Sequence, residues 1–393
     1  MAAAVNVVSI LFFGLLAGGR WLALRNLGRL VGRRNAPEPA EVVRNCRVSV
    51  CVPARDEERV IGRLLESLCS QDAADLEILV VDDHSVDRTG AIIDEYAARD
   101  PRVRRIVPPA LPDGWLGKNH ALHVASRHAT GDVLLFVDAD TVHHPGAVRT
   151  ALAWLGDADV LVVLSGQEVG TWAEHVVSPF FWCLVLSAVN VVAAEDPVQP
   201  DEAMGNGQFA MYRAGPYRAL GGHEAVRDVV VEDVSLVRRL KHAGARYRLR
   251  VGPDLTRTRM YRSFGEVWRG FSKNVAVVRP DHRVVDSIVT LGVITLVALA
   301  ELGPWIAFAV GGWCVLPGLL HLAALLWMRS AVLRRICREP GGAWPGRPAA
   351  SAWALLQPVG AVLGVLVFCN ALRLQWTRGA MWKGRALQGA RPI

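Results

Sequence analysis

Three long apolar segments limit what this chain can fold into. Residues 1–19 carry no charge, and residues 287–327 and 352–376 carry one charged residue each. A bilayer span needs about 20 apolar residues. In addition, 52% of the chain is hydrophobic, which disfavours a purely soluble protein. We therefore expect a protein with membrane-embedded parts.

The apolar segments predict two membrane regions. Residues 1–24 are expected to form an N-terminal transmembrane anchor, and residues 286–376 a helical hairpin followed by one further span or a re-entrant helix. Basic residues follow the first two segments and favour the cytoplasmic side. They are Arg20, Arg25, Arg29, Arg33, Arg34, Arg329, Arg334, Arg335 and Arg338. We expect a multi-pass protein of the cell (plasma) membrane with a cytoplasmic middle part. The side of the basic tail, residues 377–393, stays open.

Residues 45–285 follow a different pattern. Short runs rich in β-branched residues alternate with amphipathic stretches, and the runs are 48–52, 76–81, 103–107, 132–137 and 159–164. Buried strands that alternate with helices predict an α/β fold with an open, mostly parallel sheet. The seven cysteines show no zinc or disulfide spacing, and no G-x-S-x-G or P-loop motif occurs.

Acidic residues follow three of the predicted strands, at the sheet edge where such folds bind ligands. They are Asp56, Glu57 and Glu58 after the first strand, Asp82 and Asp83 after the second, and Asp138 and Asp140 after the fourth. Asp138 and Asp140 are separated by one residue directly after a buried strand. This spacing suits one divalent cation, because Mg²⁺ and Mn²⁺ prefer carboxylate and phosphate oxygens.

Two other segments carry candidate chemistry. Glu232 and Asp233 begin a predicted helix, where an acid near the positive end of the dipole stays ionised and can accept a proton. A structural helix start explains these acids as well, so both interpretations stay open. Lys118 lies at a helix start opened by glycine, a position suited to phosphate.

A basic cluster precedes the second apolar segment and consists of Arg259, Arg262, Arg269 and Lys273. These residues either anchor the chain at the membrane surface or stabilise a diphosphate leaving group. Residues 205–210 nominally match G-x-G-x-x-A, but no strand precedes them, so a flexible loop is favoured over a dinucleotide site.

The ordered motifs resemble those of family 2 glycosyltransferases of the GT-A type. They are V-P-A-R-D-E-E, V-D-D-x-S, G-W-x-G-K, D-A-D, G-x-G-Q-F, G-G-H and E-D-V-x-L, and they span roughly residues 47–275. The G-W-L-G-K, R-M-Y-R-S and W-K-G-R motifs look most similar to the lipid-modifying branch of hopanoid-associated, carotenoid and ceramide-type enzymes. The resemblance implies a GT-A catalytic domain over residues 45–285.

The resemblance also implies roles for the residues at matching positions. Asp233, with Glu232 beside it, would be the general base, and Asp138 and Asp140 would hold Mg²⁺ or Mn²⁺. Lys118 would approach the diphosphate. The other candidates for the nucleotide and its diphosphate are Pro53, Arg55, Glu57, Asp82, Asp83, Arg259 and Arg262.

The implied reaction is an inverting, metal-dependent transfer of a sugar from a nucleotide sugar, expected to be UDP-linked, to a membrane lipid. Alternatives are a polyprenyl-phosphate glycosyltransferase or a processive synthase. Related synthases carry (Q/R)-x-x-R-W, but here Ser263 follows Arg262, which disfavours a polymer product. A membrane scaffold that retained the fold, and more distantly a nicotinamide oxidoreductase, are the alternatives from other classes. No nucleic-acid partner is expected.

Residues 176–194 form a further apolar stretch between Asp138 and Asp233. A true crossing there would place these two residues on opposite sides of a bilayer. We therefore expect this stretch to lie on or in the membrane surface, near the lipid acceptor.

Overall fold

The computed structural model describes most of the chain. The described residues are 18, 21, 24–28, 46–73, 75–188, 191–277, 284–311, 315–340, 348–376, 381–382 and 385–386. The predicted anchor over residues 1–24 and the basic tail over residues 377–393 therefore lie almost wholly outside the described residues.

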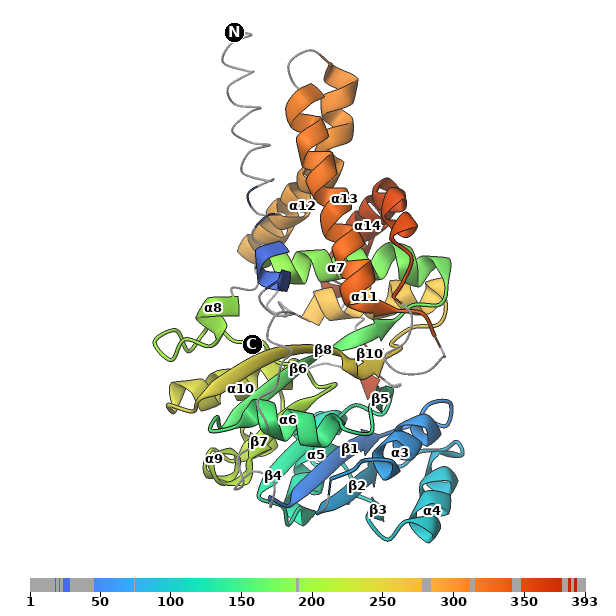
Figure 1. The fold of residues 1–393 in the computed structure, drawn as a ribbon, viewed down its shortest axis with the longest axis vertical. Coiled ribbons are helices and arrows are strands. Elements are labelled where there is room, and N and C mark those ends of the chain that lie inside the picture. The colour runs from blue at the N-terminus through green and yellow to red at the C-terminus, as the bar shows by residue number, and fades with distance from the viewer. Residues whose placement is uncertain are drawn as a thin grey trace.

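Within the described residues, a nine-stranded mixed sheet forms the centre of the α/β domain (Figure 1). The strand order is β3-β2-β1-β4-β7-β6-β8-β5, with β9 paired to β6. Strands β3, β2, β1 and β4 run parallel, whereas β7 is antiparallel to both β4 and β6. The strands are β1 (Val48–Ala54), β2 (Leu76–Asp82), β3 (Val103–Ile106), β4 (Val133–Phe136), β5 (Thr141–His143), β6 (Val160–Glu168), β7 (Ala210–Arg213), β8 (Tyr247–Thr258) and β9 (Cys337–Arg338).

The five predicted strands are confirmed as β1, β2, β3, β4 and β6. The sequence pattern missed β8, which is the longest strand described, with 12 residues. Its apolar residues are interrupted by Arg248, Arg250 and Arg257, so no continuous β-branched run marks it. Pairing with β6 on one side and β5 on the other, rather than local propensity, holds this segment extended.

Helices pack on both faces of the sheet. Successive strand residues point to opposite faces, so Val50 contributes to one buried core and Cys51 to the other. The helices of the domain are α3 (Ile61–Cys69), α4 (Thr89–Arg99), α5 (Gly117–His128), α6 (Ala147–Leu155), α8 (Val191–Ala194), α9 (Ala214–Ala219), the 3₁₀ helix η1 (Gly222–Val226) and α10 (Glu232–His242). The core that contains Val50 also contains side chains of α3 and α6, and the core that contains Cys51 contains side chains of α5 and α10.

A second layer of helices lies beyond one edge of this domain. It consists of α7 (Trp172–Ala188), α11 (Phe264–Val277), α12 (Val284–Val310), α13 (Val315–Arg335), η3 (Ser351–Leu356) and α14 (Gln357–Trp376), and a short hairpin of β10 (Met381–Trp382) and β11 (Arg385–Ala386) follows. Residues 315–335 and 351–374 are long and apolar enough to cross a membrane, judged by length and composition. The predicted hairpin corresponds to α12 and α13, of which α12 contains a shorter apolar stretch at residues 299–309.

Helices α7 and α11 lie between the sheet and the upright α12 and α13 (Figure 1). Arg329 of α13 is 1% exposed and donates a hydrogen bond of 2.7 Å to the carbonyl of Val176 in α7. Arg338 of β9 forms a 2.9 Å ion pair with Asp254 of β8. These contacts attach the apolar helices to the α/β domain. Whether residues 176–194 lie at a membrane surface stays a prediction.

Lys241 of α10 holds the segment that leads from α8 towards β7. Its ammonium group donates hydrogen bonds of 2.7, 2.8 and 2.6 Å to the carbonyls of Ala194, Gln199 and Glu202. The residue is 5% exposed, and the carbonyl of Gln199 also accepts the N–H of Glu202 at 3.2 Å. One buried cation therefore organises a segment that has little regular structure of its own.

We predict that Lys241→Met lowers the free energy of unfolding by about 1–3 kcal/mol, because three carbonyls, of which that of Ala194 is buried, lose their charged donor. Thermal unfolding in detergent measures this loss, and limited proteolysis between residues 195 and 204 should accelerate. Arg239→Met, an exposed position on the same helix, is the matched control. Equal unfolding midpoints for the two variants would contradict the assigned role.

Candidate functional site

A cavity of about 1060 Å³ opens at the carboxyl ends of β1, β2 and β4. The residues to which the resemblance gives roles line it, except Asp82, whereas Arg269 of the basic cluster does not. The lining residues among them are Pro53, Arg55, Glu57, Asp83, Lys118, Asp138, Asp140, Glu232, Asp233, Arg259 and Arg262. Residues that are almost 210 positions apart in the chain therefore meet in one space. At its far end the cavity is lined by Val185 of α7 and by Lys273 and Asn274 of α11.

Lys118 is the charge at the centre of this cavity. Its Nζ lies 2.9 Å from Oδ1 of Asp138 and 2.9 Å from Oε1 of Glu232. Burial alone would lower the pKa of Lys118, but the charges of Asp138 and Glu232 outweigh it and hold that pKa well above its ordinary value. The ammonium group therefore stays protonated and joins the end of β4 to the start of α10.

Glu232 and Asp233 begin α10, as the sequence predicts, but they have different surroundings. Burial raises the pKa of Glu232, and the ion pair with Lys118 opposes that rise. Asp233 is less buried, and its two oxygens accept the N–H groups of Gly207 at 2.9 Å and Val234 at 2.8 Å. Backbone donors thus fix the Asp233 carboxylate at the cavity surface.

The loop before β7 packs directly on this helix start, where the sequence suggested a flexible loop. A Cβ atom on Gly205 would lie 2.3 Å from the backbone of Asp233 and Val234, so only glycine allows this approach. A Cβ atom on Gly207 would lie 2.7 Å from Nζ of Lys118. The G-x-G part of the motif is therefore explained by close packing around the carboxylates rather than by a dinucleotide.

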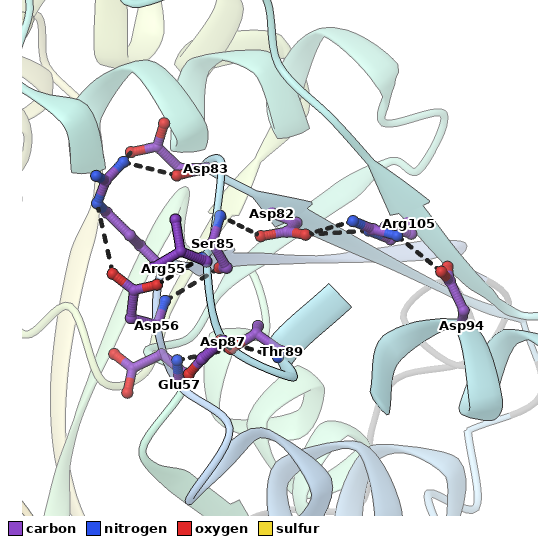
Figure 2. A network of polar contacts seen from close by, with 11 residues as sticks. Arg55, Asp56, Glu57, Asp82, Asp83, Ser85, Asp87, Thr89, Asp94 and Arg105 are labelled. Carbon is purple, nitrogen blue, oxygen red and sulfur yellow. Dashed lines mark hydrogen bonds and ion pairs between the residues drawn. The ribbon is translucent and has the colours of Figure 1, made fainter. Parts of the chain in front are cut away.

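The loops after β1 and β2 are joined by reciprocal hydrogen bonds (Figure 2). The N–H of Asp56 donates to Oγ of Ser85 at 3.0 Å, and the N–H of Val86 donates back to Oδ1 of Asp56 at 2.9 Å. The N–H of Glu57 donates to Oγ1 of Thr89 at 2.7 Å. Asp56 adopts a left-handed backbone with φ of 51° to make these contacts. This edge of the cavity is therefore firmly shaped.

Asp82 and Asp83 are neighbours in sequence but face different surroundings (Figure 2). Asp83 lines the cavity, and its carbonyl accepts a 2.8 Å hydrogen bond from Arg55. Asp82 lies outside the cavity lining and forms a 2.7 Å ion pair with Arg105 of β3, while its other oxygen accepts the N–H of Ser85. Asp82 therefore does not line this cavity, unlike Asp83, because alternate strand residues point to opposite faces. A role for Asp82 in nucleotide binding stays a prediction.

Arg259 lines the cavity, but its guanidinium group is already engaged. It forms two parallel contacts of 3.0 and 3.1 Å with Glu174 of α7. Glu174 is buried, and it also accepts the N–H of Thr171 at 2.7 Å. Arg259 therefore ties β8 to the start of α7, which the sequence reasoning did not foresee. Arg262, by contrast, is exposed at the rim.

Asp138 and Asp140 provide an incomplete set of cation ligands. No group of three His, Cys, Asp or Glu side chains suited to a metal occurs within the described part of the chain. However, Oδ1 of Asp140 is buried and has no hydrogen-bond partner among the described residues. Burial, reinforced by the charges of Asp138 and Glu57, raises the pKa of Asp140 to about 7. An oxygen-preferring cation that brings further ligands with it fits this pair.

The sequence reasoning missed several cavity residues. Asn119, Tyr261 and Asn274 line the cavity beside the predicted residues. Asn119 and Tyr261 carried a signal, because Asn119 directly follows the G-W-L-G-K motif and Tyr261 lies within the R-M-Y-R-S motif. Asn274 belongs to α11, whose approach to the sheet depends on the packing of α7 and α14 and is not encoded in any local pattern.

Comparison with known proteins identifies a matching family model and several relatives. Residues 49–221 match the family model "Glycosyl transferase family 2". A curated relative from Staphylococcus haemolyticus, named 4,4'-diaponeurosporenoate glycosyltransferase, is 26% identical over 235 residues, covering 58% of this chain and 61% of the relative. A Staphylococcus aureus protein of the same name is 29% identical over 194 residues, covering 48% and 50%. The chain thus spans between half and about three fifths of these relatives.

The fold has a solved counterpart. The mannosyltransferase PcManGT from Pyrobaculum calidifontis, solved in complex with GDP-Man and Mn²⁺, aligns with a TM-score of 0.52 and 18% identity over 94% of this chain and 98% of that chain. At this identity the likeness concerns the fold alone, and it confirms the predicted GT-A architecture. Residues 49–221 thus match the family 2 glycosyltransferase model, lie on a sheet of the GT-A fold and are followed by apolar helices.

Proposed function

We propose that this protein transfers a sugar from a nucleotide sugar, expected to be UDP-linked, to a membrane lipid with inversion at the anomeric carbon. The observation that carries the proposal is one continuous cavity. It extends from the sheet edge at Arg55 and Asp83, past Lys118 and its carboxylates, to α11 next to the apolar helices. The family of the domain and the names of its relatives support glycosyl transfer.

The sheet end of the cavity suits the donor. The loops after β1 and β2 are held rigid by reciprocal hydrogen bonds, and Pro53, Arg55, Glu57 and Asp83 line them. Lys118 offers a cation at a helix N-terminus, an arrangement that favours phosphate oxygens. A diphosphate bound here would compete with Asp138 and Glu232 for the ammonium group of Lys118.

The other end suits an acceptor that arrives from the membrane side. Val185 of α7 and Lys273 and Asn274 of α11 line it. Both helices lie between the sheet and α12 and α13 (Figure 1). The staphylococcal relatives are named 4,4'-diaponeurosporenoate glycosyltransferases, and this name supports our proposal of a non-sugar acceptor for this chain.

Asp233 is the better placed of the two acids to accept the proton of the acceptor hydroxyl. Glu232 is ion-paired with Lys118 and would have to separate from it before taking a proton. Asp233 is partly exposed and held by two backbone N–H groups, which keep the carboxylate oriented. Attack from the face opposite the diphosphate would invert the anomeric configuration.

A divalent cation fits Asp138 and Asp140, as the unpartnered oxygen of Asp140 indicates. When bound, Mg²⁺ or Mn²⁺ would neutralise charge on the departing diphosphate. Lys118 contributes a second positive charge on the same side. The solved counterpart contains Mn²⁺ and GDP-Man, which supports a metal-dependent donor site here.

The direct test is nucleotide release by detergent-purified protein with Mn²⁺ or Mg²⁺. UDP- and GDP-sugars are compared with and without a total lipid extract from the source. We expect one donor to give release that the lipid extract stimulates, with a short glycolipid as product. A polymeric product would favour a processive synthase. Metal-dependent nucleotide binding without release would contradict the proposed acceptor, and absence of nucleotide binding would favour a scaffold.

We predict that Asp233→Asn lowers turnover by about 100-fold or more, because general-base catalysis contributes factors of about 10²–10⁴. Nucleotide affinity should stay close to that of the wild type, measured by titration calorimetry. Asp201→Asn serves as control, since Asp201 is exposed and its carboxylate pairs with the exposed His242 at 2.9 Å. Turnover retained in Asp233→Asn would refute the role.

We predict that Asp138→Ala combined with Asp140→Ala abolishes the dependence of nucleotide binding on Mn²⁺. The expected reason is loss of both carboxylate ligands. Calorimetric titration of UDP and GDP, with Mn²⁺ and with a chelator, measures the effect. Asp157→Ala is the control, because Asp157 is exposed and pairs with Arg246 at the surface. Unchanged Mn²⁺ dependence in the double variant would place the cation elsewhere.

A further inference from the structure

Asn119 makes an unusual set of contacts next to the central lysine. It is 1% exposed, and its side-chain Nδ2 lies 2.7 Å from the carbonyl of Val226, 2.9 Å from that of Val229 and 3.2 Å from that of Arg227. The N–H of Leu116 adds a 2.8 Å bond to the carbonyl of Arg227. The start of α5 thus holds a turn that is more than 100 residues away in sequence.

This turn leads directly into the carboxylates. Val229 precedes Glu232 by three residues, and residues 227–231 belong to neither a helix nor a named strand. The residue before α10, Val231, makes no side-chain capping hydrogen bond, although Ser, Thr, Asp or Asn usually fixes a helix start. The position of the α10 N-terminus therefore depends on contacts from elsewhere, and Asn119 supplies three of them.

The two sides of this contact differ in how firmly they are held. On α5, Ala121, Leu122 and Ala125 are buried in the core beneath the sheet, so Lys118 keeps its place when the neighbouring amide changes. In the turn at residues 226–231, Val226 and Val229 reach the same core, whereas residues 227, 228, 230 and 231 are exposed or only partly buried. We propose that Asn119 is the positioning residue that sets the spacing between Lys118 and the pair Glu232 and Asp233.

The inference rests on the proposed function for its effect on turnover, but the contact itself is testable without any activity. An apolar side chain of similar size at position 119 removes the Nδ2 donor from three carbonyls. Those of Val226 and Arg227 keep backbone donors, the N–H groups of Val229 at 3.0 Å and Leu116 at 2.8 Å, whereas that of Val229 loses its donor. The turn then shifts to recover hydrogen bonds, and the acids move relative to Lys118. A displacement of about 1 Å in an active site can cost about 100-fold in rate. Nucleotide binding, which depends on α5 and the sheet, should change little.

Gln71 provides a matched control within the same domain. It is a buried amide whose Nε2 donates to the carbonyls of Ser67 at 2.9 Å and His144 at 2.8 Å, and whose Oε1 accepts the N–H of Val148 at 3.0 Å. It does not line the cavity. Asn119→Leu and Gln71→Met each remove one buried amide that bonds several backbone groups, so any loss of general stability should be similar.

The experiment compares full-length wild type, Asn119→Leu, Asn119→Asp and Gln71→Met in detergent. With the donor chosen by the nucleotide-sugar screen, we expect kcat to fall about 10–100-fold in both Asn119 variants, while donor KM and the UDP or GDP dissociation constant change less than about threefold. Gln71→Met should keep kcat within about twofold. Equal kcat for Asn119→Leu and Gln71→Met, or loss of nucleotide binding together with kcat, would overturn the proposal.

Hydrogen–deuterium exchange separates this inference from the proposed function. We expect faster exchange in peptides covering residues 226–236 for Asn119→Leu, with unchanged exchange across residues 120–128. If the wild type turns over no donor, the proposed function fails while the exchange result still decides the positioning role. Unchanged exchange at residues 226–236 would refute the role whether or not the protein is active.

Discussion

The two ion pairs of Lys118 are the interaction on which the rest of the site depends. One ammonium group joins the end of β4 to the start of α10 through Asp138 and Glu232. Without this cation, the carboxylates of Asp138, Glu232 and Asp233 would repel one another. The repulsion is stronger in a partly buried cavity, where less water screens the charges. Lys118 therefore allows the acids to be assembled before any ligand arrives, and a diphosphate would find the same cation at the helix start.

The surroundings of this lysine show how two parts of the chain become one site. The parallel half of the sheet brings the ends of β1, β2 and β4 to one edge, as the topology of such sheets requires. The antiparallel β7 and the loop at Gly205 then carry the chain across to α10. Arg259 and Glu174 connect that edge to α7, and Arg329 connects α7 to α13. These two sets of polar contacts join the lining of the cavity to α7, and α7 to the apolar helix α13.

Sequence reasoning was most accurate where local pattern and tertiary role agree. The strands before Asp83 and Asp138 are continuous apolar runs, and the helix at Glu232 follows its apolar periodicity, so their positions were predictable. It was least accurate where neighbouring residues of one motif point in different directions. Asp82 and Asp83 share the same motif, yet only Asp83 faces the cavity. Arg259 carries the positive charge expected to contact a diphosphate, yet its guanidinium group is paired with the buried Glu174, 85 residues earlier in the chain.

The sequence alone determined the α/β domain, the apolar helices and the residue types of the site, because periodicity, charge and motif order are local properties of the chain. Only the tertiary structure decided which acid pairs with Lys118, which arginine is already engaged, and that Asn119 holds the turn before Glu232. These are contacts between residues separated by about 85 to 115 positions. Hydrogen bonds and ion pairs at such separations depend on the packing of whole elements, and no local pattern records them.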